Sequence, residues 1–264
     1  MAAHRLCRMM AFSDLTPRVP ACGSMRGIRP TSRRYHQEAA IAQFDSWKSR
    51  LSVDSHRMNR PLFVSLDGPK GAGKTTLLEA VTRALRADNH KVIRLCEKKS
   101  DPFRGETMAL VNELVRKPSR DLELQVCKRF ADSRAWMSQH VLPEQPPDSI
   151  ILIDRWYPSD AAFRRLIPFT DILQLNLNRK VTVPDLHVGV VTAPDISWGR
   201  AAARSRGLGS TVIHKLAEHV ACTEAFERAV VDHGWVLCRN ETSIEDATLQ
   251  VVSEIYKVFR RPID

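Results

Sequence analysis

The feature that most constrains the fold of this chain is a cluster of glycines between a strand-like segment and a helical one. Residues 68–75 read Gly-Pro-Lys-Gly-Ala-Gly-Lys-Thr and fit the pattern G-x-x-x-x-G-K-[ST]. The apolar run LFVSLD (62–67) precedes the cluster, and TTLLEAVTRALRAD (75–88) follows it with apolar residues at helical spacing. This order of strand, glycine-rich loop and helix predicts a phosphate-binding loop (P-loop).

Each fixed position of this loop has a physical role. Gly68, Gly71 and Gly73 let the backbone curl tightly, so that successive N–H groups converge on a phosphate at the N-terminus of the next helix. The Lys74 ammonium adds a point charge at the β- and γ-phosphates, and the Thr75 hydroxyl can bind Mg²⁺. The residues predicted to bind the phosphates of ATP are Gly68, Lys70, Gly71, Ala72, Gly73, Lys74, Thr75 and Thr76.

Five short apolar runs, of the kind that form buried strands, alternate with helical stretches. The runs are LFVSLD (62–67), KVIRLC (91–96), SIILID (149–154), LHVGVVTA (186–193) and WVLC (235–238). Helices are expected over 75–88, twice within 104–142, over 158–178, over 195–232 with a break near 207–210, and from Ser243, where Asp246 would complete a capping box. This alternation predicts an α/β protein with the three-layer P-loop NTPase fold, in which helices flank a parallel sheet of about five strands.

The run at 149–154 ends in Asp154 and is followed at once by Arg155. An acid at this place in P-loop proteins usually holds the water shell of Mg²⁺. Motor ATPases commonly place a glutamate next, to polarise a water molecule, whereas an arginine is suited to clamping a second phosphate group. The N-K-x-D signature with which GTPases read their base is also absent from the sequence. The pattern therefore favours a small-molecule kinase over a motor or a switch.

The segment DRWYPSDAAF (154–163) resembles the D-R-Y-x-x-S-x-x-A-Y segment of thymidylate kinases. Pro184-Asp185-Leu186 resembles the P-D-L that opens the fourth strand of that family. Arg200, Arg204 and Arg206 fall where the family has its arginine-rich lid. The resemblance extends over about residues 61–260, in order and in spacing.

The resemblance implies transfer of the γ-phosphoryl group of ATP, with Mg²⁺, to a nucleoside monophosphate, with dTMP as the leading acceptor. It implies that Arg155 grips the acceptor phosphate and that Phe163 stacks on the acceptor base. It also implies a small-molecule nucleotide partner and a possible homodimer. The residues expected to act in catalysis are Lys74, Asp154, Arg155, Arg200 and Arg204, with Thr75 and Asp154 as the magnesium ligands.

The sequence departs from the family pattern at three positions on the acceptor side. Lys70 stands where the P-loop of thymidylate kinases usually has an acid or a glycine. CEKK (96–99) replaces the usual R-E-P-G and keeps only the acid, Glu97. Arg164 replaces the glutamine that reads thymine, and a guanidinium prefers a pair of acceptors, such as purine O6 and N7, or a phosphate. Arg164 is therefore a further candidate for acceptor binding, and the ATP side is better defined than the acceptor side.

Two alternatives remain open from the sequence. A deoxynucleoside kinase would use a glutamate after the second strand as general base toward a sugar hydroxyl, and Glu97 stands there. A non-catalytic nucleotide-binding module would tolerate the departures at Lys70, Cys96 and Arg164. Against this module, the sequence retains Lys74, Thr75, Asp154 and Arg155.

Charge and composition limit the other function classes. The formal net charge is +10, and residues 1–57, with ten basic and four acidic side chains, contribute +6 of it. The mildly basic remainder argues against duplex nucleic acid as a partner, and no apolar run approaches the roughly 18–20 residues that cross a bilayer. The six cysteines are scattered, which indicates reduced thiols rather than a disulfide framework or a zinc site. We therefore expect a cytoplasmic protein without a membrane partner.

The chain is expected to divide into a basic N-terminal extension (1–57) and a kinase domain (58–264). Residues 38–52 place Ile41, Phe44, Trp47 and Leu51 at helical spacing, which predicts a short helix in an extension that is otherwise partly disordered. The arginine-rich, acid-poor start is typical of an organelle transit peptide, of a disordered basic tail, or of a start codon assigned too far upstream.

Overall fold

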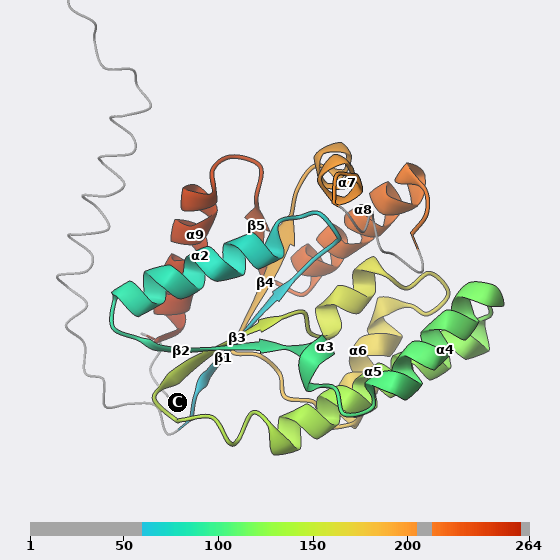
Figure 1. The fold of residues 1–264 in the computed structure, drawn as a ribbon, viewed down its shortest axis with the longest axis horizontal. Coiled ribbons are helices and arrows are strands. Elements are labelled where there is room, and N and C mark those ends of the chain that lie inside the picture. The colour runs from blue at the N-terminus through green and yellow to red at the C-terminus, as the bar shows by residue number, and fades with distance from the viewer. Residues whose placement is uncertain (1–59, 205–212, 260–264) are drawn as a thin grey trace, which may run out of the picture. The chain divides into compact units, whose positions relative to one another are not determined.

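The computed structural model describes residues 60–204 and 213–259, and they contain a five-stranded parallel sheet (Figure 1). The predicted extension and its helix at 38–52 lie outside the described residues. The strands occur in the order β2-β3-β1-β4-β5, and every adjacent pair is parallel. Their bounds are β1 Leu62–Asp67, β2 Lys91–Cys96, β3 Ser149–Asp154, β4 Leu186–Val191 and β5 Val236–Arg239. The predicted fold class and the position of each strand are confirmed, with small shifts at β4 and β5.

Helices connect the strands in sequence. Their bounds are α2 Lys74–Ala87, α3 Glu97–Ser100, α4 Arg104–Arg116, α5 Arg120–His140, η1 Tyr157–Ala162, α6 Phe169–Asn178, α7 Pro194–Ala202, α8 Leu216–Asp232 and α9 Ile244–Phe259. The predicted start of the last helix is confirmed, because the Ser243 hydroxyl accepts a hydrogen bond from the Asp246 N–H at 3.0 Å. None of the described helices combines the length and the apolar character that a membrane crossing needs.

One predicted helix is wrong. Residues 158–178 do not form one helix but a 3₁₀ turn, η1, and a separate helix, α6, with irregular backbone between them. Pro168, the N-cap of α6, explains the break, because the residue before a proline avoids the helical conformation. The short helix α3 was not predicted, since four residues carry no helical period of their own.

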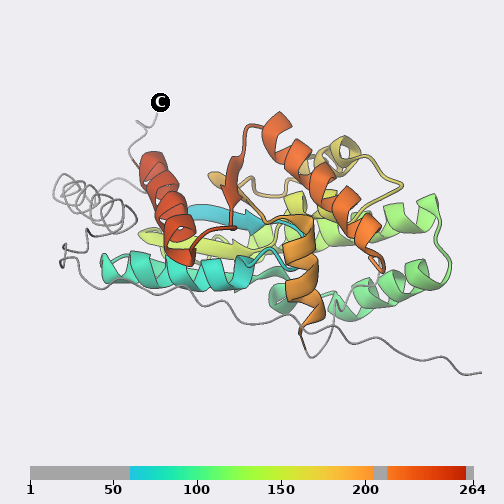
Figure 2. The ribbon, with the colours of Figure 1, turned by 90° about the horizontal axis from the view of Figure 1, so that it is seen from above.

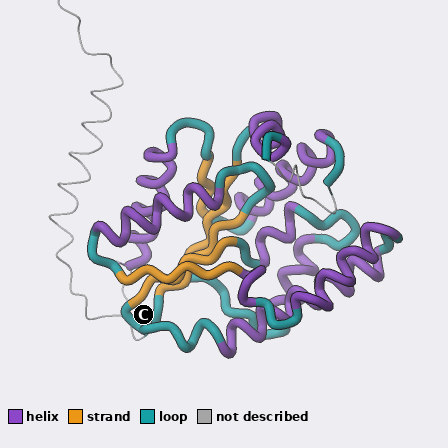
Figure 3. The backbone as a smooth tube through the Cα atoms, in the orientation of Figure 1, coloured by secondary structure: helices purple, strands orange, loops and turns teal. Residues whose placement is uncertain are grey.

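Helices cover both faces of the sheet (Figure 3). On one face α2 packs against α9, with α2 over β1, β2 and β3 and α9 over β4 and β5; Figure 2 shows α2 running alongside β1. On the other face, Met137 of α5 joins Phe63 of β1 and Ile151 of β3 in an apolar cluster, and α8 packs on β4 and β5. Because side chains alternate along a strand, the nearly continuous burial of β1, β3 and β4 means that both faces of these inner strands are covered, whereas the outer strands β2 and β5 are only partly buried.

Asp185 of the P-D-L segment fixes the start of β1. Its carboxylate accepts the N–H of Phe63 at 2.8 Å and pairs with Arg60, while its own N–H donates to the Phe63 carbonyl at 2.8 Å. At the opposite end, Asp67, Cys96 and Asp154 finish β1, β2 and β3 at one edge. Ligands of parallel α/β sheets bind at this carboxyl edge.

Candidate active site

The P-loop packs so closely against neighbouring segments that a Cβ on any of its three glycines would lie within 2.2 Å of another atom. Gly71 and Gly73 have positive φ angles of +79° and +83°. A Cβ on Gly71 would lie 1.9 Å from the Ser197 carbonyl oxygen, and one on Gly73 would lie 2.2 Å from Asn240 Nδ2. Gly73 is the N-cap of α2, whose first N–H groups have no partner within the helix. The loop therefore offers backbone at the start of α2, as phosphate binding requires.

Lys74 is held inside this loop. Its Nζ donates to the carbonyl oxygens of Gly68 at 2.8 Å and Pro69 at 2.6 Å, and the residue is only 5% exposed. Burial and the nearby charge of Arg155 lower the pKa of the ammonium well below its ordinary value, although Asp154 partly opposes them. An anion bound beside such a cation would stabilise its charged form.

Residues from three other segments contact the loop. Asn240, directly after β5, donates from Nδ2 to the Ala72 carbonyl at 2.9 Å. The Asn240 carbonyl accepts from Thr192 Oγ1 at 3.0 Å and from Arg200 Nη1 at 3.4 Å. Arg200, predicted as a lid residue, thus lies beside the P-loop. Arg204 is exposed, and its positive charge lowers the pKa of Lys74 further. The third predicted lid residue, Arg206, lies outside the described residues.

Arg155 adopts a backbone conformation that is uncommon for any residue except glycine. Its φ is +76°, and its N–H donates to the Leu66 carbonyl at 3.1 Å. The buried carboxylate of Asp67 fixes the residues that follow. Oδ1 of Asp67 accepts from the N–H of Trp156 at 2.8 Å and from the N–H and hydroxyl of Ser159 at 3.1 and 2.5 Å. Asp67 therefore positions the turn that carries Arg155.

This turn brings Arg155 to the P-loop. Its Nη1 donates to the Gly68 carbonyl at 3.3 Å, the same oxygen that accepts from Lys74. Its Cζ lies 5.1 Å from the ring centroid of Phe163, within the range of a cation–π contact. Three residues selected from the sequence, Lys74, Arg155 and Phe163, are thus brought together.

The predicted magnesium ligands lie at the same edge. Thr75 and Thr76 are exposed in the first turn of α2, and Asp154 is half-buried at the end of β3. A hydroxyl and a carboxylate are hard oxygen donors, and Mg²⁺ takes one or two of these together with phosphate oxygens and water. The donor set therefore fits Mg²⁺. Within the described ranges there is no cluster of three or more His, Cys, Asp or Glu side chains that could hold a metal by itself.

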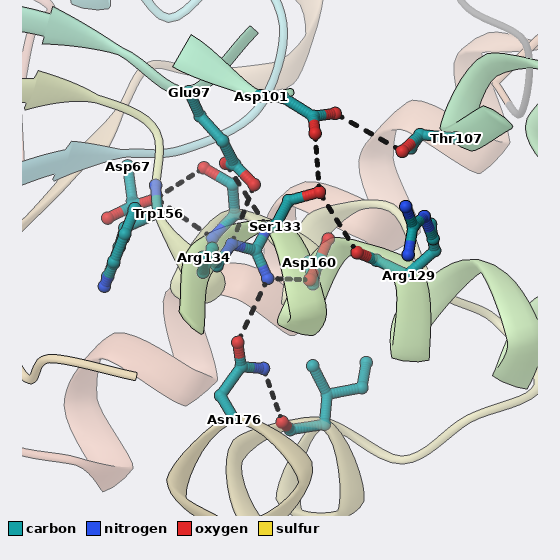
Figure 4. A network of polar contacts seen from close by, with 12 residues as sticks. Asp67, Glu97, Asp101, Thr107, Arg129, Ser133, Arg134, Trp156, Asp160 and Asn176 are labelled. Atoms are coloured by element: carbon teal, nitrogen blue, oxygen red, sulfur yellow. Dashed lines mark hydrogen bonds and ion pairs between the residues drawn. The ribbon is translucent and has the colours of Figure 1, made fainter. Parts of the chain in front are cut away.

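A buried ionic network lies behind this edge, centred on Arg134 of α5 (Figure 4). The Arg134 side chain is 2% exposed; its Nε lies 2.8 Å from Glu97 Oε1, and its Nη1 lies 2.8 Å from Asp160 Oδ2. Nη1 also donates to Asn176 Oδ1 at 3.4 Å. One guanidinium therefore connects α3, η1 and α6.

Glu97, the candidate base of the alternative function, belongs to this network. Burial raises its pKa to about 7, even though Arg134 acts to lower it. A pKa near neutrality suits a general base. Both carboxylate oxygens, however, contact Arg134, the second at 3.4 Å from Nη2. This geometry describes a residue that fixes Arg134.

Arg164 lies at the edge of the same network. Its Nη2 is 3.4 Å from Asp160 Oδ1, and its Cζ is 5.5 Å from the ring centroid of Phe130. Burial raises the pKa of Asp160, but Arg134 and Arg164 act against it, and the pKa is lowered overall. Lys70, the other basic departure from the family pattern, is half-buried in the P-loop.

Sequence reasoning missed Asp67, Arg134, Asp160 and Asn240. Asp67 carried a signal, because it is an acid at the end of an apolar strand and directly before the P-loop. Asp160 lies inside the segment that carried the resemblance. Arg134 lies within a long helix and Asn240 just beyond a short strand, and neither belongs to a local pattern that points to the site.

Comparison with known proteins identifies the family. A family model described as thymidylate kinase matches residues 66–251, which is more than half of the chain. The chain belongs to the thymidylate kinase family. A thymidylate kinase of Halalkalibacterium halodurans is 28% identical over 178 residues, 66% of this chain and 84% of the relative. A probable thymidylate kinase of Sulfurisphaera tokodaii is 26% identical over 199 residues, 74% and 96% of the two chains.

A third relative, a thymidylate kinase of Deinococcus radiodurans, is 32% identical over 158 residues, 56% of this chain and 73% of its own. The resemblance drawn from the sequence is therefore confirmed, and so is the assignment to the nucleotide kinases. The matched range, 66–251, contains the P-loop, Arg155 and the Arg134 network.

Proposed function

We propose that this chain transfers the γ-phosphoryl group of ATP to a nucleoside 5′-monophosphate, with dTMP as the leading acceptor. The observation that carries the proposal is the meeting of two cations at one oxygen. Lys74 Nζ and Arg155 Nη1 both donate to the Gly68 carbonyl, at 2.8 and 3.3 Å. Two phosphate groups, one from the donor and one from the acceptor, would compensate the mutual repulsion of these cations.

Each residue has a distinct part in this proposal. Lys74 and the N-terminus of α2 bind the donor phosphates, while Arg155 binds the acceptor phosphate and aligns its oxygen for attack. Arg200 and Arg204 contribute positive charge where the transferring group spreads negative charge over its equatorial oxygens. Bound Mg²⁺ would neutralise charge on the β- and γ-oxygens, with Thr75 and Asp154 as its protein ligands.

The proposed identity of the acceptor is supported by the names of the relatives and by the position of Phe163. The three relatives above carry the name thymidylate kinase, which makes dTMP the first acceptor to assay. The Phe163 ring lies beside Arg155, where a base can stack while its phosphate meets the guanidinium.

A panel of nucleosides and nucleoside monophosphates, assayed with Mg-ATP in excess, tests the proposal. We expect turnover with monophosphates, and we expect Arg155→Ala to raise the acceptor KM and lower kcat, because one clamp serves both binding and alignment. Arg94→Ala, at an exposed position of β2, is the matched control. ATP binding without turnover of any acceptor would instead indicate the non-catalytic module.

The nucleoside kinase alternative has one observation in its favour, the pKa of about 7 at Glu97. A sugar hydroxyl needs a base to take its proton, whereas a phosphate acceptor does not. Glu97→Gln therefore separates the two functions. A loss of kcat with nucleosides of about 100-fold or more would favour the nucleoside kinase. A small change in kcat with monophosphates agrees with the main proposal.

A further inference from the structure

Arg164 is a buried guanidinium whose hydrogen-bonding capacity is only partly used. Its side chain is 7% exposed, and its contact to Asp160 Oδ1 is long, at 3.4 Å. Its Nε is buried without a hydrogen-bond partner. Leaving a buried donor unsatisfied is unfavourable, so such a group marks a place where a ligand can supply the acceptor.

Arg134 makes more and closer ion pairs than Arg164, although its Nε, like that of Arg164, has no hydrogen-bond partner. Arg134 contacts Glu97 and Asp160, each at 2.8 Å, and donates to Asn176 as well. Asp160 therefore keeps its shorter ion pair when Arg164 turns toward a ligand. Of the two guanidinium groups, Arg164 is the one with donors to offer.

The place of Arg164 in the chain makes it a candidate for the base side of the acceptor. It directly follows Phe163, whose ring lies against the Arg155 guanidinium. Its own guanidinium lies 5.5 Å from the ring centroid of Phe130. If Arg155 meets the acceptor phosphate and Phe163 stacks on the base, as proposed above, Arg164 is the next guanidinium along the chain and a candidate to meet the edge of that base.

We infer that Arg164 widens the acceptor range from dTMP to monophosphates whose base presents two adjacent hydrogen-bond acceptors. This inference rests on the proposed kinase activity. The Nε–H and one Nη–H of arginine form a fork of two parallel donors, and a fork needs two neighbouring acceptors. Guanine provides O6 and N7, and cytosine provides N3 and O2. Thymine places an N–H between its two carbonyl oxygens, so that one of the two parallel donors would have no acceptor.

The experiment compares kcat/KM for dCMP, dGMP, dTMP and dAMP on the full chain, with saturating Mg-ATP. We expect dCMP or dGMP to match or exceed dTMP, and the better of the two tells which ring the site holds. In Arg164→Gln the kcat/KM for dCMP or dGMP relative to that for dTMP should fall about tenfold or more, because the edge of a glutamine amide presents one donor beside one acceptor instead of two parallel donors.

Two further variants separate the fork from its charge. Arg164→Lys keeps the positive charge beside Asp160 but loses the fork, so it should lower the same ratio. Arg165→Gln removes an adjacent, exposed arginine that pairs with Glu218, and should leave the ratio unchanged. Thermal unfolding of each variant verifies that it is folded. The acceptor preference of the wild-type chain tests the inference even if a variant fails to fold.

Three results would overturn the inference. They are a wild-type preference for dTMP of more than tenfold over both dCMP and dGMP, an unchanged ratio in Arg164→Gln, and a ratio that Arg164→Lys fully retains. In each of these cases the kinase activity itself would still stand. If no monophosphate at all is phosphorylated, the proposed function fails and this inference fails with it.

Discussion

The Gly68 carbonyl oxygen accepts hydrogen bonds from two cationic side chains, Lys74 and Arg155. The positive charges of the two side chains repel each other. The charge of Arg155 is the second largest cause, after burial, of the lowered pKa of Lys74. Binding of an anion relieves both the repulsion and the loss of hydration. The charges of this site are thus suited to binding phosphate.

Removal of the Lys74 charge should therefore abolish phosphoryl transfer. We expect Lys74→Ala to lower kcat by about 100-fold or more, in the range found when one donor to a developing charge is lost. The stabilisation of the fold by Mg-ATP, measured as a shift in Tm, should vanish as well. Lys91→Ala, at an exposed position at the start of β2, should keep both properties. Unchanged turnover in Lys74→Ala would contradict the role of the loop.

Glu97 should make the stability of the fold depend on pH. Its pKa is raised from 4.5 to about 7, so between these values the folded state binds more protons than the unfolded state. The free energy of unfolding must then fall as pH rises through this window, by up to about 3 kcal/mol from this group. Denaturant unfolding at pH 5 and pH 8 measures the change.

The contribution of Glu97 is the difference between the wild type and Glu97→Gln, which lacks the titrating proton. We expect the variant to lose less stability than the wild type between pH 5 and pH 8. Glu79→Gln changes an exposed residue of α2 that pairs with Arg94, and it should show the same loss of stability between pH 5 and pH 8 as the wild type. Parallel pH profiles for the wild type and Glu97→Gln would show that the carboxyl group does not take up a proton on folding.

At the scale of elements, the strands were predictable because each carries its own signal. LFVSLD, KVIRLC and SIILID are short, mainly apolar runs between turns, and β1, β2 and β3 occupy the same residues. The incorrect prediction of one helix over 158–178 has a tertiary cause as well, since η1 is held by the Asp67 carboxylate through Trp156 and Ser159. A tertiary contact of this kind overrides the helical period of a short segment.

The contact of α7 with the P-loop gives a prediction at the same scale. Gly71→Ala should lower the free energy of unfolding by about 1–2 kcal/mol, because alanine is strained at this positive φ. The added Cβ would also clash with the Ser197 carbonyl oxygen. We expect at least about a tenfold loss of ATP affinity, because the N–H groups of the loop would shift. Calorimetric titration with ATP measures that loss.

Gly199 of α7 is the matched control for Gly71. No atom lies within 4 Å of a Cβ built there, and the residue is helical. Gly199→Ala should therefore raise the free energy of unfolding by about 0.5–1 kcal/mol and leave ATP affinity unchanged. An equal loss of affinity in both variants would mean that the effect on ATP binding does not arise at the loop.

At the scale of the whole molecule, the Arg134 network could not be read from the sequence. Glu97, Arg134, Asp160 and Asn176 belong to four separate elements, and only the fold brings them together. The P-loop and Arg155, in contrast, were predictable because their chemistry is written in contiguous residues. Residues that lie in contiguous motifs are therefore accessible to sequence reasoning, whereas the Arg134 network depends on side chains that meet through tertiary structure.

A chain that begins at Met58 should retain the fold and the kinase activity. All five strands, and the range that matches the family, lie beyond this residue. The removed segment carries +6 of the net charge of +10, so the shortened chain should elute from a cation exchanger at lower salt. Activity assays and thermal unfolding of both chains test the proposal that 58–264 is the kinase domain. Loss of folding in the shortened chain would contradict it.

The left-handed backbone at Arg155 has a consequence for how this position can vary. With φ at +76°, glycine would fit the turn more comfortably than any other residue. Stability of the fold alone would therefore favour glycine at this position. If Arg155 binds the acceptor phosphate as proposed, the need for its guanidinium opposes that preference, and a relative that has lost the activity could replace it with glycine at no cost in stability.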